Sequence, residues 1–413
     1  MIYNLVMKSK DKLFILITLI YTAFMLFPPF ALFPVELMSV GVVLLLLVLF
    51  PQCLRDNYFK WFCLYIVVLF VYCIFHHNFH INGIGRSMNL FNKLMIETAW
   101  ILPNILICSI IRNTNNAKVF RIVGMGLLVI ISISFLFMLP SVLAGGNVLR
   151  NNVRLTESGE RGNILLPSYT LMSSFSFLLP VACYGIKYTK RFLKYYFVAL
   201  TVLIVYMVVK SEITTSFLAS CFVLLFTLAY RKNIQNLPVI FVTMAVIMWL
   251  IYISGALLAF VDYLISLYEG TVAQVKFMEF RDMLLGNDEG DNLGVRELCR
   301  EMSMDCFYTN PLIGSPDVGG HSSLLDHLGS MGLLGFIPFV MMLITNIQMW
   351  IRFLPDKGTK LFYFSGILII FVFLYNKGLF SGQGMLMLFV VLPVAIYGIY
   401  LYVNKVSISK TLY

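Results

Sequence analysis

The chain has 413 residues, of which 60% are hydrophobic and only 12% are charged. This composition, which includes 36 phenylalanines and 22 methionines, argues against a water-soluble globular protein, because too few polar side chains remain to cover its surface. Lipid is therefore the expected solvent.

Apolar segments along the whole chain predict an all-α polytopic membrane protein with about 12 transmembrane helices, since one span needs about 20 predominantly apolar residues. The first run is long and lacks a small-residue cleavage site, so a removable signal peptide is not expected. The even number of spans places both termini on one side. In chain order, the spans are expected at residues 13–33, 36–54, 61–79, 90–111, 122–140, 168–187, 196–210, 214–230, 237–260, 330–351, 361–379 and 384–403.

Basic residues are sorted between the two sides of this single predicted domain, which covers residues 1–413. Of the 30 lysines and arginines, 19 fall on the side of the termini, together with only three acidic residues. By the positive-inside rule this side is the cytoplasm. The net charge of +10 therefore reflects membrane orientation, and no nucleic-acid partner is expected.

Two extracytoplasmic connections are long, at residues 141–167 and 261–329, and loops of more than about 15 residues are usually functional or disordered. The second, between predicted spans 9 and 10, is expected to form helices near 271–285 and 292–305. The first of these helices is amphipathic and is predicted to lie on the membrane surface. Its residues Val272, Val275, Phe277 and Met278 are expected to face lipid, and Lys276 and Glu279 to face water.

Arg296 and Arg300 are four residues apart on the second predicted loop helix, so their guanidinium groups lie on one face. Like charges at this spacing are mildly destabilising unless an anion binds, and the planar guanidinium suits phosphate oxygens. The alternative is a solvated pair that Glu297 and Glu301 balance.

A histidine precedes a predicted helix start near the end of the large loop. Ser323 followed by Asp326 resembles a capping box, with His321 just before it. A histidine at this boundary can accept a proton near neutral pH, although an interfacial histidine beside an ordinary cap is the alternative. Asp326 is expected either to orient His321 or only to cap the helix. His327 should point elsewhere on a regular helix.

The string His321-Ser-Ser-Leu-Leu-Asp-His-Leu-Gly-Ser-Met-Gly-Leu-Leu-Gly, preceded by Asn310-Pro-Leu-Ile-Gly and by Arg296, resembles the large loop of the O-antigen ligase and polymerase superfamily. That loop carries an Arg on a helix, an Asn-Pro-Leu-x-Gly turn, His-Asn or His-Ser, and a Gly-x-x-Gly that opens the next span. The His-Ser form with Asp326 is most similar to Wzy-type polymerases of O-antigen, capsule or exopolysaccharide. The likeness covers about 40 residues and the many-span architecture.

This resemblance implies a GT-C-like, metal-independent glycosyltransferase without a cofactor, whose active site lies outside the bacterial cytoplasmic membrane. The donor would be a glycan on undecaprenyl diphosphate, and the acceptor a hydroxyl of another lipid-linked repeat unit. His321 would be the base, and Arg296 with Arg300 would stabilise the departing diphosphate. Ser322 and Asp326 are expected near the substrate. Membrane lipid, a chain-length regulator and a flippase are the expected partners.

Other outer cations are weaker candidates for donor binding. Arg150, Arg154 and Arg161 in the first long loop are explained equally well by solvation. Lys210 occupies a place where relatives carry Ser-Arg, but here the Lys precedes the Ser. An Arg-x10-Gly pattern described for some polymerases is absent from the outer loops, and Arg86 is a minor candidate for lipid phosphate.

His76, His77 and His80 look like metal ligands at first. Adjacent histidines at the end of a span are more typical of interfacial anchors, so we expect no metal site.

Three other functions compete with a polymerase. A ligase would move finished glycan from the same lipid to another acceptor. A flippase or transporter of lipid-linked sugars would carry ionisable residues along its spans, whereas here most lie in loops and span ends. A structural scaffold would leave the Arg and His pattern unexplained.

Overall fold

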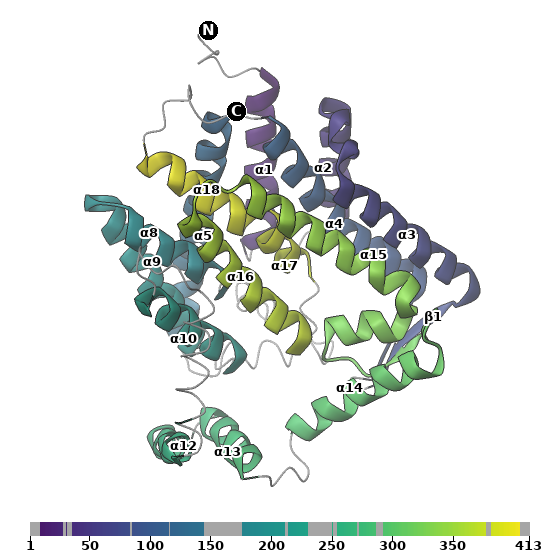
Figure 1. Cartoon of the computed structure of the whole chain (residues 1–413), viewed down its shortest axis with the longest axis vertical. Coiled ribbons are helices and arrows are strands. Elements are labelled where there is room, and N and C mark those ends of the chain that lie inside the picture. Colours follow the sequence, from purple (N-terminus) through teal and green to yellow (C-terminus); the bar gives the residue numbers. More distant parts are fainter. Residues whose placement is uncertain are drawn as a thin grey trace.

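The computed structural model describes residues 9–27, 30, 35–82, 85–114, 116–143, 176–210, 214–229, 250, 254–270, 272–285, 292–376 and 381–404. Within these ranges the chain is mostly helical. Figure 1 shows the helices gathered into one bundle, with α12 and α13 lying beyond one end of it.

The first half of the chain supplies α1 (Ser9–Leu26), α2 (Val35–Leu49), the short η2 (Pro51–Arg55), α3 (Asn57–Phe75), α4 (Leu90–Asn113), α5 (Ala117–Leu143), η4 (Ser176–Leu178), α8 (Leu179–Tyr188), α9 (Arg191–Lys210) and α10 (Thr214–Ala229). The second half supplies α12 (Ala256–Leu267), α13 (Val272–Leu284), α14 (Asn292–Thr309), α15 (Ser323–Phe353), α16 (Lys357–Asn376), α17 (Gly382–Leu386), a π-helical turn (Met387–Val391) and α18 (Leu392–Val403). The strands are β1 (Asn78–Ile81), β2 (Arg86–Asn89) and β3 (Asp317–Val318).

Seven segments of the described chain are long and apolar enough to cross a membrane, which confirms the helical membrane character. They are α3, α4, residues 117–140 of α5, α9, α15, residues 357–375 of α16, and residues 382–403. The predicted span at 168–187 is described only from residue 176, where η4 and the ten-residue α8 follow each other. Most of the predicted span at 237–260 lies outside the described residues, and its last part forms a turn at 254–255 and the start of α12.

The core of the bundle lies around α4 and the last two membrane segments. In an apolar 18-residue stretch of α4, 72% is buried inside the structure, and in the corresponding stretch of residues 382–403, 78% is buried. These are the largest buried shares among the seven segments. Close helix approach depends on small residues, because a Cβ on Gly124 of α5 would lie 2.8 Å from the carbonyl oxygen of Val394 in α18.

A small sheet with the order β2-β1-β3 closes one end of the bundle, and no sequence pattern predicted it. β1 pairs antiparallel with β2, and parallel with β3, so that His80 lies opposite Asp317 and Ile81 opposite Val318. The predicted span at 61–79 is therefore too long: α3 ends at Phe75, and the polar residues after it form β1. This pairing brings the segment after α3 beside the large loop.

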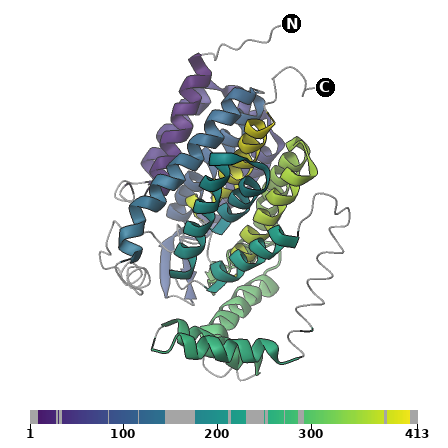
Figure 2. The same cartoon turned by 90° about the vertical axis from the view of Figure 1, so that its left-hand side faces the viewer.

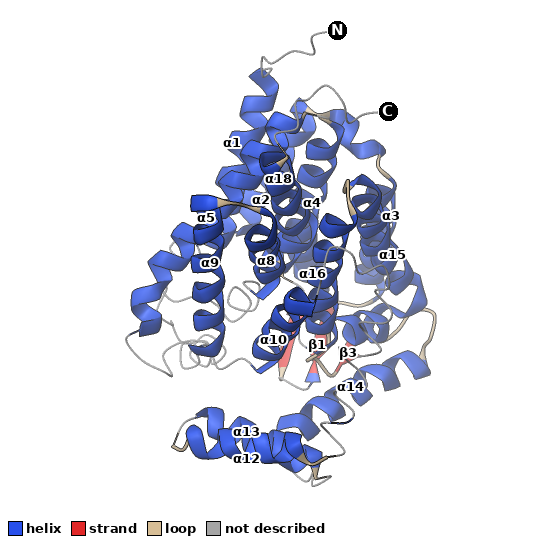
Figure 3. Cartoon of the chain, turned by 60° about the vertical axis from the view of Figure 1, so that its left-hand side comes forward, coloured by secondary structure: helices blue, strands red, loops and turns tan. Residues whose placement is uncertain are grey.

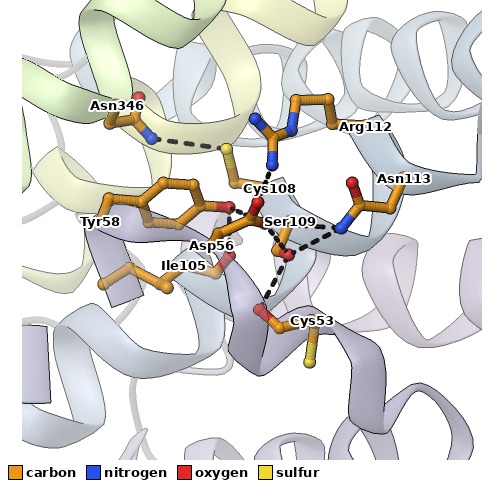
Figure 4. A network of polar contacts seen from close by, with 9 residues as sticks. All are labelled: Cys53, Asp56, Tyr58, Ile105, Cys108, Ser109, Arg112, Asn113 and Asn346. Carbon is orange, nitrogen blue, oxygen red and sulfur yellow. Dashed lines mark hydrogen bonds and ion pairs between the residues drawn. The ribbon is translucent and has the colours of Figure 1, made fainter. Parts of the chain in front are cut away.

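The opposite end of the bundle collects the start of α1 and the α4–α5 connection. Asn116 donates to Asp11 at 3.3 Å, and Arg112 at the end of α4 forms an ion pair with Asp56. Figure 4 shows Asp56 also accepting from Ser109 and, at 3.3 Å, from Tyr58. Segments that the sequence places on the side of the termini thus meet at one end.

The predicted loop helices near 271–285 and 292–305 are confirmed as α13 and α14. In Figures 2 and 3, α12 and α13 lie together at the end of the bundle remote from the start of α1. Val275 and Met278 of α13 are half exposed, as expected for a surface-lying face. The prediction that Glu279 faces water is wrong, because only 6% of this residue is exposed.

Candidate functional site

The helix α14 packs directly against the segment that carries His321. A Cβ on Gly319 would lie 1.8 Å from the carbonyl oxygen of Cys299, so only glycine allows this approach. The N–H of Gly319 donates to Ser303 Oγ at 3.0 Å, and a Cβ on Gly329 would lie 2.3 Å from the Ser303 carbonyl oxygen. One face of α14 is therefore fixed to both sides of the His321 turn.

The turn Asn310-Pro-Leu-Ile-Gly supports a kink in α15. Gly332 has φ 54° and ψ −159°, which interrupts the helix. The N–H groups of Leu333 and Leu334 donate to the carbonyls of Pro311 and Leu312 at 2.9 and 3.1 Å. These bonds replace the intrahelical bonds that a kink removes, which gives this stretch of the motif a structural role.

Asp326 holds the backbone on both sides of His321. Its Oδ1 accepts from the N–H of Gly320 at 3.1 Å and its Oδ2 from the N–H of Ser322 at 3.3 Å. The Ser303 hydroxyl donates to Oδ1 at 2.7 Å, so α14 joins the same carboxylate. If Asp326 orients His321, it does so through its hydrogen bonds to the backbone of the turn.

The helix cap lies one residue earlier than predicted. Ser322, rather than Ser323, is the N-cap, and its side chain accepts from the N–H of Leu325 at 3.3 Å. Ser322 is fully buried. Its hydroxyl therefore stabilises the start of α15, and the predicted contact with substrate remains untested.

His321 has a left-handed backbone conformation, with φ of 70° directly after Gly320 at 86°. For a residue with a Cβ this conformation costs about 1–2 kcal/mol, and such strain persists where surrounding contacts impose it, often at functional sites. The two N–H bonds to Asp326 are those contacts. Side-chain exposure of His321 is intermediate.

The two arginines lie on α14, the helix that packs against this turn. Arg296 is one helical turn before Cys299, which touches Gly319, and Arg300 follows Cys299 directly. The guanidinium carbon of Arg300 lies 5.1 Å from the ring centroid of Tyr375, at the end of α16. Arg300 is therefore held against a membrane helix as well as on the loop helix.

Burial lowers the pKa of the Arg296 guanidinium, the negative charge of Glu279 opposes that shift, and the neighbouring Arg300 adds to it. The repulsion between the two arginines agrees with their predicted placement on one face. The acid that acts on Arg296 is Glu279 of α13, while Glu297 and Glu301 are exposed. Two cations in a partly buried place favour an anionic ligand.

A buried polar cluster lies behind the site, and sequence reasoning missed it. We call it the Glu97 cluster: Glu97 and Lys93 of α4, Tyr65 of α3 and His327 of α15. Their exposed fractions are 4, 7, 0 and 4%. Tyr65 donates to Glu97 Oε2, while Lys93 Nζ and His327 Nε2 lie 3.5 and 3.7 Å from Glu97 Oε1. Lys93 and Glu97 are four apart, which was the available signal.

Other predicted residues do not join this site in the described structure. Arg150, Arg154 and Arg161 lie outside the described residues. Lys210 is exposed at the end of α9, and the backbone of Arg86 belongs to β2. In the described part of the chain, no group of three His, Cys, Asp or Glu side chains is arranged to hold a metal ion.

The site around His321 rests on packing and hydrogen bonds within this chain alone. No protein-family model matches the chain, and no curated protein matches it significantly.

Proposed function

We propose that this protein polymerises undecaprenyl-diphosphate-linked oligosaccharide repeat units into a surface polysaccharide. The transfer is metal-independent and takes place on the outer side of the bacterial cytoplasmic membrane. The observation that carries the proposal is the packing of α14, with Arg296 and Arg300, against the turn that holds His321. A strained histidine on a turn that packs against the helix of two partly buried cations supplies both groups that such a transfer needs.

In this mechanism a ring nitrogen of His321 takes the proton of the acceptor hydroxyl as its oxygen attacks the anomeric carbon of the donor. The bond between that carbon and the diphosphate oxygen breaks, and the anomeric centre inverts. Arg296 and Arg300 stabilise the negative charge that develops on the departing diphosphate. Asp326 acts through the backbone by keeping His321 in place.

The membrane arrangement belongs to the same proposal. We propose a GT-C-like chain of about 12 spans with both termini in the cytoplasm, which places the end with α14 and the sheet outside. Contacts between segments that are all expected in the cytoplasm support this orientation, because Arg112 at the end of α4 pairs with Asp56 before α3, and Asn116 before α5 donates to Asp11 of α1.

A flippase or transporter of lipid-linked sugars is the second candidate. The Glu97 cluster favours it, because ionisable groups buried among membrane helices often mark transport pathways. The sequence indicated that most charged groups lie in loops and at span ends, but Lys93 and Glu97 are buried among the helices. A ligase remains the alternative within the enzyme class.

Purified protein in detergent, incubated with radiolabelled lipid-linked repeat units, tests the proposal. We expect a ladder of oligomers on a gel, which neither a flippase nor a ligase forms from repeat units alone. His321→Ala should reduce the ladder by about 10²–10⁴-fold, the usual contribution of a general base. His77→Ala, an exposed histidine at the same end, is the matched control.

Two results would contradict the proposal. Normal chain lengths and yield from His321→Ala would remove the base from the mechanism. A wild-type protein that moves the lipid across vesicle membranes but forms no ladder would instead favour the transporter.

A further inference from the structure

The Glu97 cluster connects the two structural elements between which His321 lies. On one side, Lys93 Nζ lies 3.8 Å from the ring centroid of Phe79 in β1. β1 pairs with β3, and β3 leads through Gly319 and Gly320 into His321. The ammonium group of Lys93 is thus attracted to the strand that fixes the entry to the turn.

On the other side, the cluster reaches the first turn of α15. Glu97 Oε1 lies 3.7 Å from Nε2 of His327, and Nδ1 of His327 lies 2.6 Å from the carbonyl oxygen of Ser323. The His327 ring stacks on Phe339 beyond the kink, with centroids 4.4 Å apart. The exit from the His321 turn therefore lies against the same carboxylate that Lys93 pairs with.

Charged groups buried among membrane helices are costly and are kept where they serve a function. In this cluster Glu97 has three partners on three helices, namely Tyr65 of α3, Lys93 of its own helix and His327 of α15. An apolar contact in the same place would fill space, but it would not fix the rotation of α15, which directed polar contacts do.

We propose that Lys93 and Glu97 are positioning residues for the His321 turn. They join β1 to the first turn of α15 and so hold the backbone that Asp326 fixes between residues 320 and 322. The effect on catalysis rests on the proposed function, whereas the effect on the turn does not. In this role neither Lys93 nor Glu97 contacts the substrate.

The test uses the double variant Lys93→Met/Glu97→Gln in the full chain. Removing one charge alone would leave its partner buried and uncompensated, whereas replacing both keeps the volume and the net charge of the pair. Hydrogen exchange is measured on the peptide that contains the N–H groups of Gly320 and Ser322, which donate to Asp326. We expect it to exchange about tenfold faster, as local opening becomes easier.

The matched control is Asp56→Asn/Arg112→Met, which removes an ion pair at the opposite end of the bundle (Figure 4). It should leave exchange of the 320–322 peptide unchanged. In the polymerisation assay, the Lys93/Glu97 double variant should show a kcat about tenfold lower with an unchanged KM, because a misplaced base slows chemistry without weakening binding. Lys93→Arg, which keeps the charge, should retain most of the rate.

The outcomes separate this inference from the proposed function. Wild-type exchange of the 320–322 peptide in a folded double variant overturns it, whatever the activity. Faster exchange in a protein whose wild type forms no ladder supports the positioning role and refutes the polymerase. Should the double variant fail to accumulate, His327→Asn breaks the same link from α15, and unchanged exchange there also overturns the inference.

Discussion

The hydroxyl of Ser303 in α14 donates to Asp326 Oδ1 in α15 at 2.7 Å and accepts from the N–H of Gly319 at 3.0 Å. One side chain thus joins the loop helix, the entry to the His321 turn and the helix that follows it. Ser303 is fully buried, so no water replaces these bonds when the hydroxyl is removed.

Ser303→Ala should therefore destabilise the protein by about 1–3 kcal/mol, because it leaves buried polar partners unsatisfied. We expect a lower unfolding temperature in detergent and a weaker polymer ladder. Ser365→Ala is the control, since the hydroxyl of Ser365 is also buried but, among the described residues, bonds to the Phe362 carbonyl of its own helix, at 2.8 Å. Equal unfolding temperatures of the two variants would contradict the role of Ser303.

Gly319 permits the close approach of the turn to α14. Gly319→Ala places a Cβ against the Cys299 carbonyl oxygen, a backbone atom that cannot rotate away, so α14 must shift. We expect a lower unfolding temperature and loss of most polymerisation. Gly41→Ala in α2, where a Cβ meets nothing within 4 Å, should be neutral or slightly stabilising. Wild-type activity of Gly319→Ala would show that α14 need not touch the turn.

Tyr375 is expected to hold Arg300 through its ring. An exposed cation–π contact contributes about 0.5–1 kcal/mol, so Tyr375→Leu should raise the KM for the lipid-linked donor about two- to fivefold with little change in kcat. Tyr375→Phe keeps the aromatic face and should behave as wild type. An equal loss in both variants would point to the Tyr375 hydroxyl instead.

Much of the fold could be predicted from the sequence because lipid imposes a simple rule on helix length and composition. The segments around α3, α4, α5, α9, α16 and α18 follow that rule, and so does the position of the large loop. The sheet could not be predicted, since strands of two to four residues carry no periodicity and β1 pairs with β3 across most of the chain.

The candidate site was predicted only in part, for a similar reason. Arg296, His321 and Asp326 belong to one short stretch whose motif can be compared with a family. Ser303 and the Glu97 cluster act through contacts between distant segments, which no local spacing shows. His327 was expected to point elsewhere than the mechanism on a regular helix, and its direction into the bundle depended on how α15 packs on α3 and α4.

Among the described residues, Glu279 is the acid whose charge acts on Arg296 in the absence of substrate. It is buried in α13, and its negative charge opposes the fall in the pKa of Arg296 that burial causes. A bound diphosphate would bring two or more negative charges to the same guanidinium group, so it must compete with this carboxylate.

Glu279→Gln should therefore strengthen donor binding, since it removes the competing charge while keeping the size of the side chain. We expect the KM for the lipid-linked donor to fall about three- to tenfold. Glu269→Gln, an exposed acid between α12 and α13, should leave the KM unchanged. A raised KM in Glu279→Gln would mean that Glu279 orients Arg296 for the donor, because losing an orienting partner weakens binding whereas losing a competitor strengthens it.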